Sequence, residues 1–184
     1  VKMFGTNNLT KHLGGNKMRE IRQKYSSKDT SINSTKLPAI YNLRSKQLRE
    51  RKILDIGGGK YDTAKTWGNE NGSQVNIYDK FNRSEEENNE ALSVQDYDVA
   101  ILSNVLNVIC EAEIRRDLVK LATEKAPITY ITVYEGNKTG IGKVSKKDCW
   151  QENRKTKDYV DEIQSYVPDM LVTRKGKVIE IRVA

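Results

Sequence analysis

A run of three glycines lies between two acidic residues in the first half of the chain. Gly57, Gly58 and Gly59 follow an apolar segment that contains Asp55, and Asp62 comes three residues after the run. Because glycine has no side chain, the backbone at such a turn can approach a ligand closely. A glycine-rich turn directly after a buried strand is typical of proteins that bind nucleotide-like ligands.

The two acids weigh against a dinucleotide as that ligand. The dinucleotide fingerprint is G-x-G-x-x-G, and here Asp62 stands at the position of the third glycine. A pyrophosphate would sit at a helix N-terminus, where Asp55 and Asp62 would add two like charges. A nicotinamide dehydrogenase is therefore disfavoured, and a zwitterionic ligand without phosphate is favoured. S-adenosylmethionine is such a ligand: Asp55 can orient its ammonium group, and Asp79, at the end of the next strand, can accept both ribose hydroxyls.

The elements around the turn alternate between strand-like and helix-like patterns. Apolar runs predict strands at residues 52–57, at 73–79, at the start of 98–109 and at 127–136. Amphipathic patterns predict helices at 34–50, 61–71, 111–126 and 155–167, and the C-terminal residues 169–184 read as a hairpin. This alternation predicts an α/β fold, a Rossmann-like, doubly wound and mostly parallel sheet that ends in an antiparallel hairpin.

Two kinds of boundary follow from the same patterns. Ser34 or Thr35 can cap the helix at 34–50, and Asp62 can cap the helix at 61–71. Residues 1–33 form a basic N-terminal extension, with a helix expected around 17–25, and residues 34–184 form a single domain.

Ligands of doubly wound sheets bind beyond the carboxyl ends of the strands, where the winding reverses. This rule places the glycine turn, Asp79 and residues 103–107 on one rim of the sheet.

Three stretches resemble the motifs of class I S-adenosylmethionine-dependent methyltransferases. ILDIGGGKYD resembles their first motif, VNIYDKFNR their second and DYDVAILSNVLNVI their fourth-strand motif, together covering about residues 50–134. Within that superfamily the chain resembles small methyltransferase-like proteins of phages and mobile elements, including those associated with DNA phosphorothioation. The stretches TSINSTKLP, SNVLNVI and GKVSKKDCWQENRKTKDYVDEI carry this narrower resemblance.

The resemblance implies S-adenosylmethionine as cofactor and a set of residues that bind it: Asp55, Gly57, Gly58, Gly59, Asp79, Asp96, Ser103 and Asn104. Asp96 belongs to this set by position alone, as a candidate for adenine contacts together with its neighbours from Ser93 onward. Only 19 positions separate Asp79 from Asp98, so the fold is shortened between its second and fourth strands: the helix and strand usual in this interval are short, or one is missing.

The methyl acceptor is not revealed by the cofactor motifs. Asn104 can hold an amino group through its carbonyl oxygen, but the Pro-Pro-aromatic sequence of DNA amino-methyltransferases is missing after it. Glu135 can act as a base, and Trp150 can stack on a flat acceptor or fold over the cofactor; a solvated acid and a tryptophan at the core edge are equally good interpretations. Cys110 lacks the neighbouring proline of cytosine-C5 enzymes and reads as a packing residue.

Charge suggests the partner. The formal net charge is +7, and residues 1–52 hold 13 Lys or Arg against 3 acidic residues, with a second basic cluster at 138–157. Such asymmetry indicates DNA or RNA as partner, or a solvated basic extension. Three functions stay open: a methyltransferase for nucleic acid or a nucleotide-like acceptor, one for a small molecule or protein, and a phage protein that sequesters the cofactor without transferring its methyl group.

The remaining composition fits a cytoplasmic protein. Two cysteines do not make a disulfide framework, and with His12 as the one histidine no metal site is expected. No apolar run approaches the length of a membrane span, and no secretory signal is recognisable at the start.

Overall fold

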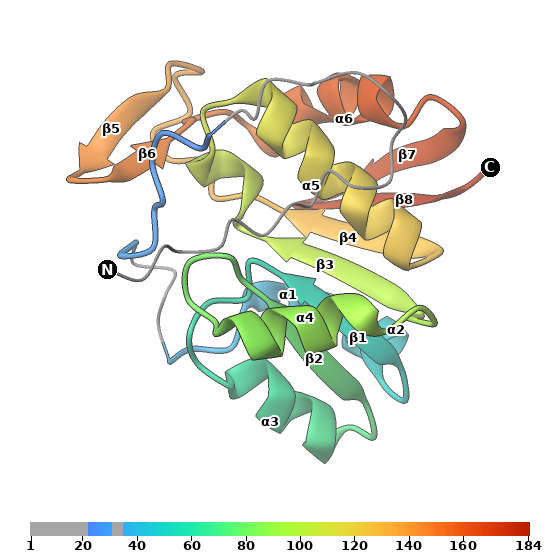
Figure 1. The fold of residues 1–184 in the computed structure, drawn as a ribbon. Coiled ribbons are helices and arrows are strands. Elements are labelled where there is room, and N and C mark those ends of the chain that lie inside the picture. Colours follow the sequence, from blue (N-terminus) through green and yellow to red (C-terminus); the bar gives the residue numbers. More distant parts are fainter. Residues whose placement is uncertain (1–21, 31–34) are drawn as a thin grey trace, which may run out of the picture.

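The computed structural model describes residues 22–30 and 35–184. Six strands form one sheet in the order β2-β1-β3-β4-β8-β7 (Figure 1). Their bounds are β1 Lys52–Ile56, β2 Gln74–Tyr78, β3 Val99–Ser103, β4 Ile128–Thr132, β7 Met170–Lys175 and β8 Val178–Val183. The first four strands are parallel, and β8 runs antiparallel to both β4 and β7. The predicted α/β fold class, with its C-terminal antiparallel hairpin, is confirmed.

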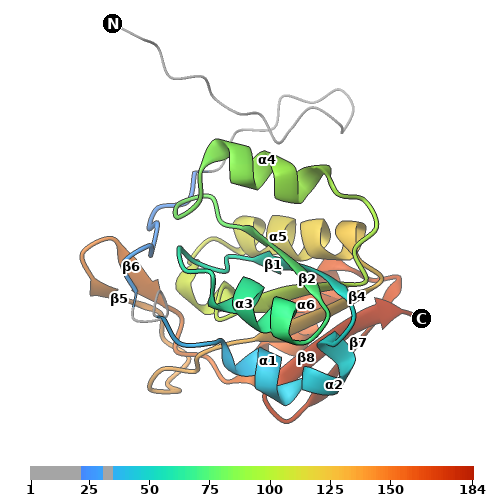
Figure 2. The same ribbon diagram turned by 90° about the horizontal axis from the view of Figure 1, so that it is seen from below.

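The central strands are apolar on both sides because helices cover both faces of the sheet. All five residues of β3 are buried, as are the last four of β1. Helices α4 (Glu85–Ser93), α5 (Ala112–Lys125) and α6 (Val160–Tyr166) pack on one core. Helices α1 (Ala39–Leu43), α2 (Ser45–Leu48) and α3 (Thr63–Glu70) pack on the other. Figure 2 shows α4 and α5 above the sheet and α1 and α2 below it.

The short interval after β2 lacks a strand and keeps its helix. The chain leaves β2, forms α4 and enters β3 directly, so β2 is the edge of the sheet. Helix α4 is held at its start by a capping box, in which Ser84 and Glu87 each bond the other's backbone N–H. The predicted shortening between the second and fourth strands is therefore confirmed, with the strand as the missing element.

Several local boundaries differ from the sequence prediction. The helix expected at 34–50 is two short helices that meet at Arg44, and the first begins after Pro38 with no side-chain cap from Thr35; Ser34 lies outside the described residues. Asp62 does precede α3, but its carboxylate caps nothing there. The helix expected around 17–25 falls mostly outside the described residues, and 22–25 are not helical.

The basic stretch 138–157, for which the sequence analysis predicted no strand, has regular structure. It contains a second, two-stranded sheet, β5 (Lys143–Lys146) and β6 (Cys149–Gln151), followed by the 3-10 helix η2 (Thr156–Tyr159). Within the part of the chain that the structure describes, no helix is both long and apolar enough to cross a bilayer.

Candidate functional site

The winding of the sheet reverses between β1 and β3. From β1 the chain moves to β2 on one side, and from α4 it returns to β3 on the other. The segments after the carboxyl ends of β1 and β3, residues 57–62 and 104–109, therefore meet at the switch point where doubly wound sheets bind ligands.

Asp55 lies beneath this switch point with one oxygen lacking a partner. The residue is 1% exposed, and its Oδ2 accepts a hydrogen bond of 2.6 Å from the Tyr41 hydroxyl of α1. Among the residues that the structure describes, no hydrogen-bond donor reaches Oδ1. The pKa of the Asp55 carboxyl is raised to about 6: burial is the largest cause, the Tyr41 hydrogen bond and the Arg83 charge lower it, and the Asp79 charge adds to the rise.

The glycine turn is shaped by close neighbours at two positions. Gly57 has a φ of +74°, and a Cβ added there would lie 2.6 Å from a methyl carbon of Val105. A Cβ added at Gly58 would lie 2.8 Å from Ile77 and 3.1 Å from Asp55 Oδ1. Glycine is needed at both positions, because a side chain would push apart the segments after β1 and β3 or cover the Asp55 carboxylate.

Asp79 supports the turn from the adjacent strand. Its Oδ2 accepts the Gly59 N–H at 2.9 Å. Its Oδ1 accepts three bonds, from the backbone N–H groups of Phe81 and Asn82 and from the Asn82 side chain. As the carboxylate is oriented, only Oδ2 has an acceptor position left, so it can serve one ribose hydroxyl where the sequence suggested two.

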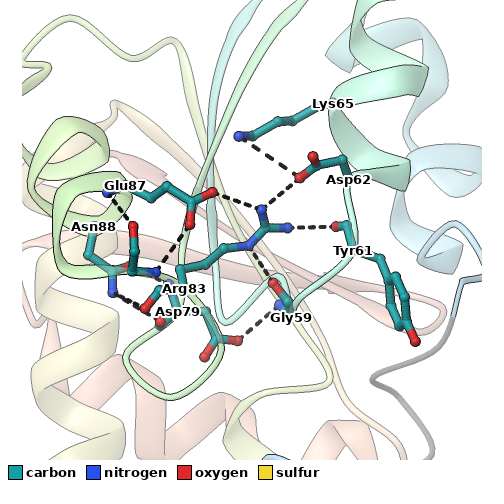
Figure 3. A network of polar contacts seen from close by, with 9 residues as sticks. Gly59, Tyr61, Asp62, Lys65, Asp79, Arg83, Glu87 and Asn88 are labelled. Carbon is teal, nitrogen blue, oxygen red and sulfur yellow. Dashed lines mark hydrogen bonds and ion pairs between the residues drawn. The ribbon is translucent and has the colours of Figure 1, made fainter.

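Arg83 joins the turn to α4, and sequence reasoning missed it. The side chain is 5% exposed and donates to the Gly59 carbonyl at 2.7 Å, the Tyr61 carbonyl at 2.7 Å and the Asp62 carboxylate at 2.6 Å (Figure 3). It also donates to Glu87 at 3.1 Å. Arg83 neutralises Asp62 and lowers the pKa of that carboxyl.

The segment after β3 brings two further predicted residues to the same edge. Ser103 is 6% exposed, and its hydroxyl lies 3.1 Å from that of Thr132. Asn104 has a φ of +58° and donates its backbone N–H to the Thr132 carbonyl at 2.8 Å. Its side chain is partly exposed. Asp55, the three glycines, Asp79, Ser103 and Asn104 are thus grouped at one rim.

Asp96 is not part of that rim. It forms an ion pair with Lys52, the first residue of β1, and therefore lies at the amino end of the sheet. The helix α4 runs the length of the sheet before the chain reaches Asp96, which carries this position to the opposite edge. The prediction that Asp96 contacts the cofactor is not supported by this placement.

Glu135, the predicted base, is bonded to neighbouring residues. It accepts the backbone N–H of Thr156 at 2.7 Å and the Thr156 hydroxyl at 2.9 Å, and Lys138 lies 3.6 Å away. The Thr156 bonds, with Lys138, lower the pKa of the Glu135 carboxyl. A carboxylate that is already bonded and less basic than usual is poorly suited to accept a proton, so the structure weighs against Glu135 as a base.

Trp150 stacks within the protein. Its ring lies against Tyr25, with centroids 5.6 Å apart and planes at 13°. On Gly142, an added Cβ would come 2.3 Å from the indole ring. Trp150 thus joins residues 22–30 to the β5–β6 hairpin and is not folded over the glycine turn.

Solved structures share this architecture. A Burkholderia thailandensis 1,6-didemethyltoxoflavin-N1-methyltransferase, with 1,6-didemethyltoxoflavin and S-adenosylhomocysteine bound, superposes with a TM-score of 0.60 at 14% identity, over 85% of this chain and 80% of the other. A TehB-like SAM-dependent methyltransferase of Corynebacterium glutamicum gives 0.51 at 14%, over 81% and 89%. The pyocyanin biosynthetic protein PhzM gives 0.53 at 16%, over 79% of this chain and 53% of its own.

The chain therefore has the fold of class I S-adenosylmethionine-dependent methyltransferases. No protein-family model matches its sequence, and no curated protein sequence is significantly similar to it. At these identities the comparisons establish the architecture, and the chemistry has to be argued from the residues at the rim.

Proposed function

We propose that this protein is an S-adenosylmethionine-dependent methyltransferase that binds its cofactor at the rim between β1 and β3. The observation that carries the proposal is the unpartnered Oδ1 of Asp55, buried below a glycine turn at the switch point. A buried carboxylate oxygen without a donor is unfavourable in a protein. The ammonium group of the cofactor, directly or through water, would supply both the donor and the opposite charge.

The other rim residues fit the rest of that molecule. Asp79 Oδ2 would accept one ribose hydroxyl, and the backbone of residues 57–59 would lie against the ligand. Ser103 and Asn104 would border its amino-acid part. When bound, S-adenosylmethionine supplies an electrophilic methyl group on sulfur, and Asn104 would hold the acceptor through its side-chain carbonyl oxygen.

Nucleic acid or a nucleotide-like molecule is the acceptor class that we propose, with a cytoplasmic setting. Its support is charge, because the basic residues at 22–30 and 138–157 gather beyond the carboxyl ends of β3 and β4. A small-molecule acceptor is the second candidate, since the Burkholderia enzyme holds 1,6-didemethyltoxoflavin. Sequestration of the cofactor by a phage or mobile-element protein would need the same rim without any transfer.

Calorimetric titration tests the cofactor. We expect S-adenosylmethionine to bind and NAD⁺ not to bind. In Asp79→Ala the affinity should fall by about 1.5–3 kcal/mol, because a charged acceptor of the ribose is lost. Asp96→Ala is the matched control: it removes an acid at the opposite edge and should leave the affinity unchanged. Binding of NAD⁺ in place of S-adenosylmethionine would disprove the proposal.

Transfer is tested with tritium-labelled S-adenosylmethionine and separate pools of DNA, RNA, protein and small molecules from a bacterial lysate. Label in DNA or RNA supports the proposed acceptor, and label in small molecules alone supports the second candidate. Tight cofactor binding with no label in any pool would leave sequestration as the function.

A further inference from the structure

We infer that residues 22–30 and 134–157 form one surface, here called the hairpin surface, that binds single-stranded nucleic acid beside the rim. The inference deepens the proposed function, because it names the form of nucleic acid that the acceptor side accepts. In Figure 1 the β5–β6 hairpin and residues 22–30 lie together beyond the ends of β3 and β4.

The two segments are joined by specific contacts. Ser26 and Ser27 bond Asp148, at the β5–β6 turn: the backbone N–H of Ser26 donates to the Asp148 carboxylate at 3.1 Å, and that of Ser27 donates to the Asp148 carbonyl at 2.9 Å. The Tyr25–Trp150 stack covers the same joint. Residues 22–30 are therefore part of the hairpin surface.

A buried ionic network anchors the hairpin to the helical layer. Arg115 of α5 donates to Glu152, just after β6, at 2.8 Å and to the Ile109 carbonyl at 2.7 Å. It also bonds Glu162 of α6 at 2.6 Å. Arg115 is 5% exposed and Glu152 9% exposed. Breaking a pair this deep is costly, so the surface is held rigidly relative to the rim.

These contacts occupy acidic side chains of the hairpin surface and leave three of its lysines exposed. Glu152 is bonded inward to Arg115 and Glu135 to Thr156, whereas Asp148, which bonds Ser26, and Asp29 are exposed. Lys143, Lys146 and Lys147 are exposed, and none of them forms an ion pair within the described part of the chain. The outer side of the hairpin is therefore a positive surface that is available to phosphates.

Exposed apolar side chains accompany these lysines. Tyr134 is 60% exposed, Ile141 72% and Val144 50%. Tyr134 is the second residue after β4, and its backbone N–H donates to Asn107, in the segment after β3. The backbone at Tyr134 therefore lies next to the segment after β3. Phosphates alone need only cations, whereas an exposed aromatic ring and aliphatic groups suit the faces of unstacked bases. Duplex bases are hidden in the stack and would have to be flipped out to reach the rim.

Fluorescence anisotropy on the full chain tests the inference, with labelled 20-nucleotide oligo(dT), an RNA of the same length and a 20-base-pair duplex. We expect both single strands to bind more tightly than the duplex. If about five phosphates are neutralised, the affinity should fall roughly 100-fold between 50 and 200 mM salt. In Lys143→Gln/Lys146→Gln/Lys147→Gln the slope of log K against log [salt] should become shallower by about 2.

The matched control removes the same charge elsewhere. Lys46, Arg49 and Lys120 are exposed and lie away from the rim, and their triple Gln variant should keep the single-strand slope. Tyr134→Ala should weaken single-strand binding by about fivefold or more, and Tyr134→Phe should retain it. No single-strand binding at 50 mM salt, tighter duplex binding, an equal loss in the control, or equal affinity for poly-L-glutamate would each overturn the inference.

The assay also separates this inference from the proposed function. Calorimetry with S-adenosylmethionine is run on the same hairpin triple variant, which leaves the glycine turn untouched. Cofactor binding without strand binding would refute only the hairpin surface. Strand binding without cofactor binding would refute the methyltransferase and leave the surface intact.

Discussion

Asp55→Asn should stabilise the protein at neutral pH while it weakens cofactor binding. The wild-type carboxyl is buried, and its pKa is raised from 3.8 to about 6. A raised pKa in an acid means that folding disfavours the ionised form. Its contribution to stability is therefore fully favourable below pH 3.8 and is lost as the pH rises through about 6. Asparagine cannot ionise, and its carbonyl oxygen can still accept the Tyr41 hydroxyl.

The size of the effect follows from the shift. A change of about two pKa units, at about 1.4 kcal/mol each, corresponds to about 3 kcal/mol. The free energy of unfolding of Asp55→Asn minus that of the wild type should therefore rise by about 2.4 kcal/mol between pH 4 and pH 7.5, since the first part of the change falls below pH 4. Urea titrations at several pH values measure this difference, and all other titrating groups cancel because both proteins contain them.

Asp169→Asn serves as the control, because Asp169 is exposed and its replacement should give no such trend. Wild-type affinity for S-adenosylmethionine should fall as the pH drops below about 6, since protonation of Asp55 removes the charge that attracts the ammonium. The variant should bind weakly at every pH. A stability difference that is the same at pH 4 and pH 7.5 would refute the burial argument, and undiminished affinity in the stable variant would refute the ammonium contact.

Three shorter predictions concern the turn and its surroundings. Arg83→Met should lower the stability by about 2 kcal/mol and weaken cofactor binding, because two carbonyl groups of the turn lose their donor. An unchanged melting temperature and an unchanged affinity would show that the turn keeps its shape without Arg83. Gly57→Ala should destabilise by more than 2 kcal/mol in a urea titration, and adding Val105→Ala should restore only part, since the positive φ remains; full rescue would mean that strain is negligible. Glu135→Gln should keep the pH profile of methyl transfer, and loss of the acidic limb would instead identify Glu135 as a base.

The sheet and its ligand-binding edge could be predicted because periodicity and strand ends are local signals. The apolar runs of β1 and β3 mark strands buried on both faces, and Asp55 and Asp79 are placed at the rim by the ends of their strands alone. The position of Asp96 could not be predicted, for the opposite reason. Its place depends on the direction of α4, which carries the chain to the other edge, and no residue spacing between Asp79 and Asp96 encodes that turn.

Side-chain contacts between residues far apart in the sequence could not be predicted from the sequence. Tyr41 and Asp55 are 14 positions apart, and Arg115 and Glu152 are 37 apart, so each pair forms only because packing brings two elements together. One signal could have identified Arg83: it follows Asp79 by four positions and directly precedes the capping box of α4. A cation at that place can reach back to the turn, whereas Glu135 looked available only because Thr156 is 21 positions away.

The acidic residues counted in the sequence argue against a phosphate-containing ligand at the glycine turn. The structure changes which of them carry that argument. Asp62 was counted as a negative charge beside the turn, yet Arg83 pairs with it at 2.6 Å. Asp55 was counted as a full charge, yet burial raises its pKa to about 6. The argument against phosphate therefore depends mainly on Asp55 and on Asp79, which presents Oδ2 to the rim. Since a buried, donor-poor carboxylate attracts an ammonium and repels a phosphate most strongly when ionised, discrimination between the two ligands should itself grow as the pH rises through 6.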